Sequence, residues 1–176
     1  MTTRLRANQG TGSGRFLSSH YIEEVKKMSH KSQERNMRRL AELLGQDLSY
    51  IWGENESGPN GAKKQFLNAG KVFLRALAKD LGLHKVSVSS NAAGIGVSGD
   101  CTLMGMWHTN GLYVSLSQFR AGGESVLLYR TIRHSKDYTG GYNIFLTLRE
   151  LAEMDYTDLL FKLAALREED THERAA

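Results

Sequence analysis

The spacing of apolar residues changes at Gly82, and this change constrains the fold more than any other feature of the chain. Before Gly82, small or apolar residues recur at intervals of three or four, which is the spacing of one helix face: Phe66, Gly70, Phe73, Leu77 and Leu81. After Gly82, residues 84–89 alternate as a β-strand does. Because glycine is the usual residue just beyond a helix end, the sequence predicts a helix over 62–81 followed directly by a strand.

The rest of the chain extends this pattern in both directions. A helix is expected from Ser18 and Ser19 to Gly45, either continuous or broken across 29–36, where no large apolar residue occurs. Four further strands are expected, two of them joined through Asn110-Gly111, and these strands span 101–107, 112–117, 125–132 and 143–146. A capping box at 147–150 begins a C-terminal helical region that permits a break near 155–157.

These elements predict an α+β fold with N-terminal helices, a central antiparallel meander sheet of about five strands, and a C-terminal helix or helix pair. Residues 1–17 are glycine-rich and basic and are predicted to form a flexible arm. The domain itself is expected to span 18–168, and 169–176 to form a polar tail.

The composition excludes several classes of protein. The single cysteine, Cys101, rules out an intrachain disulfide, and the chain has no apolar run long enough to span a membrane. The six histidines are scattered and match no zinc-site spacing. We therefore expect a cytoplasmic protein with no membrane contact, no metal and no other cofactor.

The charge of the chain is unevenly distributed. The formal net charge of +4 combines +6 over 1–82, +2 over 83–147 and −4 over 148–176. On the predicted helix 62–81, four cations occupy the face opposite Phe66, and only Asn68 interrupts them: Lys64, Lys71, Arg75 and Lys79. A second basic run on the first helix is diluted by Glu34: Lys27, Lys31, Arg35, Arg38 and Arg39. Unmixed cations suit contact with phosphates, and a solvated helix face is the alternative.

A second candidate contact surface is the segment 129–143, which combines cations and tyrosines around a glycine turn. The residues expected to bind a partner there are Arg130, Arg133, Lys136 and Tyr138. The alternative is a polar hairpin in which Asp137 pairs with Arg133 or Lys136.

Two sequence features suggest a catalytic or cofactor site, but the elements expected around them do not fit such a site. The string 94–99 has the form G-x-G-x-x-G, but a strand is expected after it where a dinucleotide site needs a helix. Cys101 and His108 are seven residues apart, which places them on opposite faces of a regular strand. No catalytic residue is assigned, and an unrecognised enzyme site near Gly94–His108 stays as an alternative.

Three strings carry a resemblance to a known group: 94–99, Leu127-Leu128-Tyr129-Arg130-Thr131 and Lys136-Asp137-Tyr138-Thr139-Gly140-Gly141. Over about residues 90–150 the chain resembles small proteins encoded on mobile elements and phages of gut bacteria, a group associated with anti-CRISPR activity. The resemblance implies a stoichiometric inhibitor of the type II RNA-guided nuclease. Its partners would be the nuclease–guide complex, duplex DNA or both. A general DNA-binding accessory protein of a mobile element is the alternative.

A homodimer is also expected. The edges of a small meander sheet need covering. The apolar side chains of Met104, Met106 and Trp107 exceed what one face of an alternating strand can bury.

Overall fold

A computed structural model describes residues 19–46, 48, 61–92, 97–119 and 124–167 of the 176-residue chain. The arm predicted for 1–17, the tail predicted for 169–176 and part of the glycine-rich string at 94–99 lie outside these residues. Among the residues described, no helix is both long and apolar enough to cross a membrane.

Two long helices form the N-terminal half of the fold. The first, α1 (Ser19–Leu44), continues without a break through 29–36, so the continuous form of the predicted helix is correct. Its second half is held by fully buried side chains such as Met37 and Leu40. The next, α3 (Ala62–Asp80), ends just before Gly82, whose φ of 64° is the left-handed conformation expected of a helix-stopping glycine.

Five antiparallel strands form one sheet, and they lie in the order in which they occur in the chain. Their bounds are β1 (His84–Asn91), β2 (Asp100–Met106), β3 (Gly111–Leu116), β4 (Ser125–Ile132) and β5 (Ile144–Thr147). The predicted five-stranded meander and the α+β class are therefore confirmed.

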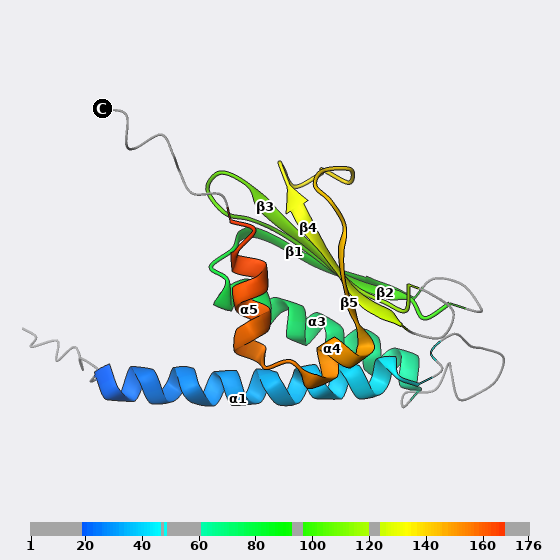
Figure 1. The fold of residues 1–176 in the computed structure, drawn as a ribbon, viewed down its shortest axis with the longest axis horizontal. Helices are drawn as coiled ribbons and strands as arrows, with labels where there is room; N and C mark the ends of the chain where they lie inside the picture. Colours follow the sequence, from blue (N-terminus) through cyan, green and yellow to red (C-terminus); the bar gives the residue numbers. More distant parts are fainter. Residues whose placement is uncertain (1–18, 47, 49–60, 93–96, 120–123, 168–176) are drawn as a thin grey trace, which may run out of the picture.

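The helices cover one face of this sheet (Figure 1). Leu112, Val114 and Leu116 of β3 point towards them and are fully buried. Helix α3 contacts β1 and β2, whereas the short helix α4 (Leu148–Glu153) contacts β4 and β5. Helix α1 runs across α3, α4 and α5 (Tyr156–Ala164) on the side remote from the sheet. The fold therefore has three layers, with α3 and the C-terminal helices in the middle.

The C-terminal helices begin as the sequence predicts. The Thr147 hydroxyl accepts a hydrogen bond from the Glu150 backbone N–H at 3.1 Å, and the Glu150 carboxylate accepts one from the Thr147 N–H at 2.7 Å. This is the expected capping box. The expected break is present too, because α4 ends at Glu153 and α5 begins at Tyr156.

The predicted β2–β3 hairpin forms at Asn110-Gly111, but Gly111 is the first residue of β3 and not part of the turn. Residues 107–110 make the turn, which is closed by the Trp107 N–H and the Asn110 carbonyl oxygen at 2.8 Å. Gly111 already pairs with Met106 in the sheet. A Cβ on Gly111 would lie 2.5 Å from the Gly105 carbonyl oxygen. The close approach of the chains, and not a turn conformation, therefore requires glycine there.

Candidate functional site

The cationic face of α3 lies on the outside of the molecule. Lys64, Arg75 and Lys79 are exposed, and Lys71 is half-buried. The opposite face of the helix buries Phe66, Gly70, Phe73 and Leu77, as the spacing of these residues predicts. Within the part of the chain that the structure describes, none of the four cations forms an ion pair. The only acidic residue of α3, Asp80, instead accepts a hydrogen bond from Tyr156 on α5 at 2.7 Å. This α3 cation face (Lys64, Lys71, Arg75, Lys79) is therefore an unneutralised row of charge.

Part of the second basic run lies next to α3. The Arg39 guanidinium on α1 donates to the side-chain oxygen of Gln65 on α3 at 2.9 Å and pairs with Glu42 at 3.2 Å. Arg39 is thus partly neutralised and links the two helices. Lys31, Arg35 and Arg38 are exposed on α1.

Cys101 lies beneath α3 and is not placed to act as a nucleophile. Its side chain is fully buried, and its S–H donates to the Leu67 carbonyl oxygen at 3.4 Å. Burial and the nearby Asp100 charge raise the pKa of the Cys101 thiol to about 11, although Lys71 opposes this shift. A thiol with this pKa carries almost no thiolate at neutral pH.

His108, the other residue of the candidate thiol–imidazole pair, lies far from Cys101 in the fold. His108 is exposed in the turn after β2, where its ring lies 5.5 Å from that of His84. The structure therefore does not bring Cys101 and His108 together. The residue after Gly99 begins β2, so the G-x-G-x-x-G string also lacks the helix that a dinucleotide site needs.

The loop between β4 and β5 is built around Asp137. This carboxylate is 3 % exposed and accepts hydrogen bonds from the Arg133 backbone N–H at 3.1 Å, the Arg133 Nε at 2.8 Å and the Thr139 N–H at 3.2 Å. The hydrogen bonds from the Arg133 side chain and backbone hold the pKa of Asp137 well below its usual range. Asp137 therefore stays ionised and ties Arg133, at the start of the loop, to Thr139 in its middle.

Two of the four contact residues predicted in this segment, Arg133 and Arg130, make contacts within the protein. Arg133 pairs with Asp137, which is the alternative that the sequence left open. The Arg130 guanidinium donates to the Tyr138 carbonyl oxygen and lies 4.9 Å from the centre of the Tyr113 ring. Lys136 and Tyr138 project from the loop, and Tyr138 is 68 % exposed. The structure thus brings together the four residues predicted in this segment. Both arginines bind groups of the protein itself, whereas Lys136 and Tyr138 face solvent.

The two predicted surfaces lie on opposite sides of the sheet. Arg130 pairs with Tyr113, and the neighbours of Tyr113 in β3 are Leu112 and Val114, which face the helices. Because side chains alternate along a strand, Arg130 and Tyr113 lie on the face away from α3. One partner binding site cannot combine the α3 cation face with the loop unless the partner wraps around the sheet edge.

Sequence reasoning missed the exposed apolar side chains of β5. Ile144 and Phe145 are 38 % and 43 % exposed, and because they are consecutive they lie on opposite faces of the sheet. Tyr142, in the predicted segment 129–143, is 93 % exposed. The alternation in 143–146 signals a strand, but only the observed order of strands shows that this strand is a sheet edge.

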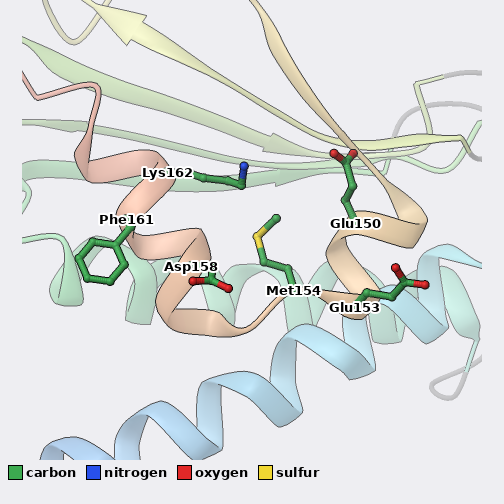
Figure 2. Close-up of a pocket in the computed structure, with 6 residues that line it drawn as sticks. All are labelled: Glu150, Glu153, Met154, Asp158, Phe161 and Lys162. Carbon is green, nitrogen blue, oxygen red and sulfur yellow. The ribbon is translucent and has the colours of Figure 1, made fainter.

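A shallow groove between α4 and α5 was also missed (Figure 2). It encloses about 550 Å³, and its lining residues are Glu150, Glu153, Met154, Asp158, Phe161 and Lys162. Met154 lies between Glu150 and Lys162 in the close-up. Two of the three carboxylates have partners, since Glu150 caps α4 and Glu153 pairs with Arg149 at 3.0 Å. Across the described residues, no cluster of histidine, cysteine or carboxylate side chains is suited to a metal ion.

Comparison with known proteins adds no relative. No family model matches the chain, and neither a curated protein nor a solved structure matches it.

Proposed function

We propose that this protein is a non-enzymatic binding protein that contacts an anionic macromolecular surface through the α3 cation face. The observation that carries the proposal is the absence of ion pairs at all four cations, within the described residues, on a helix whose only acid is engaged by Tyr156. Four like charges within about 22 Å of helix repel one another in the free protein. Contact with phosphates removes this repulsion and adds counterion release.

The resemblance of residues 90–150 to an anti-CRISPR group suggests which macromolecule is bound. In this more specific form of the proposal, the protein acts in the cytoplasm as a stoichiometric, anti-CRISPR-type inhibitor of a type II RNA-guided nuclease. It binds the nuclease–guide complex, duplex DNA or both. The exposed Tyr138 and Lys136 of the loop are the second set of contacts, because tyrosine and cationic side chains contribute strongly at interfaces.

The test is a DNA-cleavage assay in which the nuclease–guide complex is titrated with this protein. Full inhibition near one protein per nuclease supports the proposal, and inhibition far below that ratio indicates turnover and an enzyme. A variant with alanine at Lys64, Arg75 and Lys79 is expected to lose most inhibition. If duplex DNA binds this protein but cleavage is unaffected, the alternative of a general DNA-binding accessory protein is correct.

We also propose that two copies associate through the β5 edge. Ile144 and Phe145 are 38 % and 43 % exposed there, and unpaired strand edges next to apolar side chains favour association. Light scattering is expected to give twice the chain mass of 19.6 kDa at high concentration. The variant Ile144→Lys is expected to remain monomeric, and a wild-type mass near that of one chain at all concentrations contradicts the dimer.

A further inference from the structure

Three residues of the α3 cation face, Lys71, Arg75 and Lys79, lie beside the outer edge of β1. The chain passes from α3 to β1 through only residues 81–83, so the helix and the strand run in opposite directions. At the far end, Gly70 of α3 abuts Cys101, which pairs with Ser90 of β1. Lys79 is therefore near the start of β1, and Lys71 is near its end.

The cations are on the flank of α3 that points beyond the β1 edge. Phe73, on the opposite flank, packs on Tyr156 of α5 with ring centres 6.1 Å apart. Helix α5 follows α4, which contacts β4 and β5, so Phe73 points towards the interior of the molecule. The side chains that lie opposite Phe73 on the helix consequently project outward at the β1 side.

The β1 edge is suited to pairing with another strand. Among the described residues, β1 pairs only with β2. Charged residues, prolines and β-bulges are the features that natural proteins use to block an edge. In β1 they are confined to its start, where Lys85 has a φ of 50° and the register shifts between His84 and Ser87, and Ser87–Ser90 contains none of them. The other edge of the sheet is shorter, since β5 has four residues and β1 has eight.

A second copy of β1 is a poor occupant of this edge. Strands in a sheet are about 4.8 Å apart, so a symmetric β1–β1 pairing would place two α3 helices about 10 Å apart. Their cation faces would then meet without any acidic residue between them. An occupant that brings negative charge is favoured instead.

The spacings select the kind of occupant. Lys71, Arg75 and Lys79 are four residues apart on α3, which is about 6 Å along the helix axis. Alternate residues of a strand are about 6.7 Å apart and point to the same face of a sheet. A strand added to β1 would therefore present every second side chain to this row of cations.

We propose that the β1 edge and the α3 cation face form a docking site for an extended acidic segment of a partner protein, with carboxylates at alternate positions. The segment adds a sixth strand through backbone hydrogen bonds to β1, and its carboxylates pair with Lys71, Arg75 and Lys79. This goes beyond the proposed function, because a nucleic acid needs only the cations and not the strand edge.

The probe is a fluorescent eight-residue peptide in which glutamate alternates with threonine, and its binding is followed by anisotropy at low salt. A peptide with the same composition but four threonines followed by four glutamates is the charge control. We expect the alternating peptide to bind at least tenfold more tightly. The double variant Arg75→Glu, Lys79→Glu is expected to lose this binding, and the matched double variant Arg149→Glu, Lys162→Glu, on α4 and α5, is expected to retain it.

Two N-methylated forms of the alternating peptide test the strand edge directly. One is methylated at the odd residues and the other at the even residues, so only one of them blocks the amides that face β1. We expect one form to lose binding and the other to keep it, and bound peptide to slow amide exchange across Val86–Ser90. Equal binding of both forms, equal binding of the charge control, or no binding of the alternating peptide overturns the proposal. Slow exchange of the same amides without peptide, together with a doubled mass, shows a second copy at this edge and also overturns it.

Binding of duplex DNA to the same variants separates this proposal from the proposed function. Duplex binding without peptide binding contradicts the docking site alone. Peptide binding without duplex binding supports the docking site and contradicts nucleic-acid contact by the α3 cation face.

Discussion

The Tyr156 hydroxyl donates a hydrogen bond to the Asp80 carboxylate across 2.7 Å, and this contact joins the start of α5 to the last turn of α3. Burial and the charge of Asp80 raise the pKa of Tyr156 far above its ordinary value, so the hydroxyl keeps its proton and remains the donor. The same contact directs the only acid of α3 away from the four cations.

Tyr156→Phe is expected to lower the free energy of unfolding by about 1 kcal/mol, because it removes one hydrogen bond and keeps the buried ring. For a chain of this length the melting temperature should fall by about 3 °C. Thermal melts followed by circular dichroism measure this change. Tyr138→Phe is the control and should melt as the wild type does, since Tyr138 is exposed. An unchanged melt of Tyr156→Phe would show that the bond contributes no net stability.

Gly70→Ala should destabilise the protein although alanine favours helices. The added Cβ would lie 2.7 Å from Cys101 Sγ and 3.1 Å from Cys101 Cβ. Overpacking costs about 1–3 kcal/mol, which exceeds the helix-propensity gain of about 1 kcal/mol. Urea denaturation of the single variants and of the double variant with Cys101→Ala tests this. Because the double variant lacks the clashing sulfur, it should be more stable than Gly70→Ala alone. If Gly70→Ala is as stable as wild type, residue 70 and Cys101 are not in close contact.

The Asp137 anchor should make stability depend on acidic pH. Because the folded pKa of Asp137 lies below the unfolded value of about 3.9, its stabilisation is complete above that value and is lost as pH falls towards the folded pKa. Asp137→Asn should therefore be less stable than wild type at pH 7, and the difference should shrink below about pH 4. Urea midpoints from pH 2 to pH 7 measure it. Glu153→Gln, which alters an exposed pair, should show little difference at any pH.

Duplex DNA should bind weakly and without sequence preference. Three to four phosphate contacts predict a slope of about −3 to −4 in a plot of log affinity against log salt concentration. Alanine at Lys64, Lys71, Arg75 and Lys79 should abolish binding, whereas alanine at Arg149, Lys162 and Arg167, which are exposed and lie elsewhere, should leave it intact. Anisotropy titrations at several salt concentrations provide the measurement. Binding absent at tens of micromolar protein in low salt, or an unaffected fourfold variant, would exclude this role.

The elements and their buried faces could be predicted because they depend on local spacing. The period of three or four in α3 identifies Phe66 and Phe73 as buried, and the same count places Arg75 outside. The position of Arg130 could not be predicted in this way. Its stacking on Tyr113 depends on the register between β3 and β4, which is set by contacts far apart in sequence.

The place of Gly111 inside β3 could not be predicted for a related reason. The dipeptide is a strong local signal, but Gly111 is enclosed by Gly105, Met106 and Ile132 from neighbouring strands. Packing between strands therefore determined where the turn lies. The placement of the β1 edge beside the α3 cation face likewise emerges only once the order of strands is known.

The sheet that separates Arg75 from Tyr138 also separates the two surfaces sterically. A molecule bound along α3 would leave the β4–β5 loop open to solvent, and a molecule bound at the loop would leave α3 open. Occupation of one surface therefore leaves the other accessible, so two partners bound on opposite sides of the sheet would not compete.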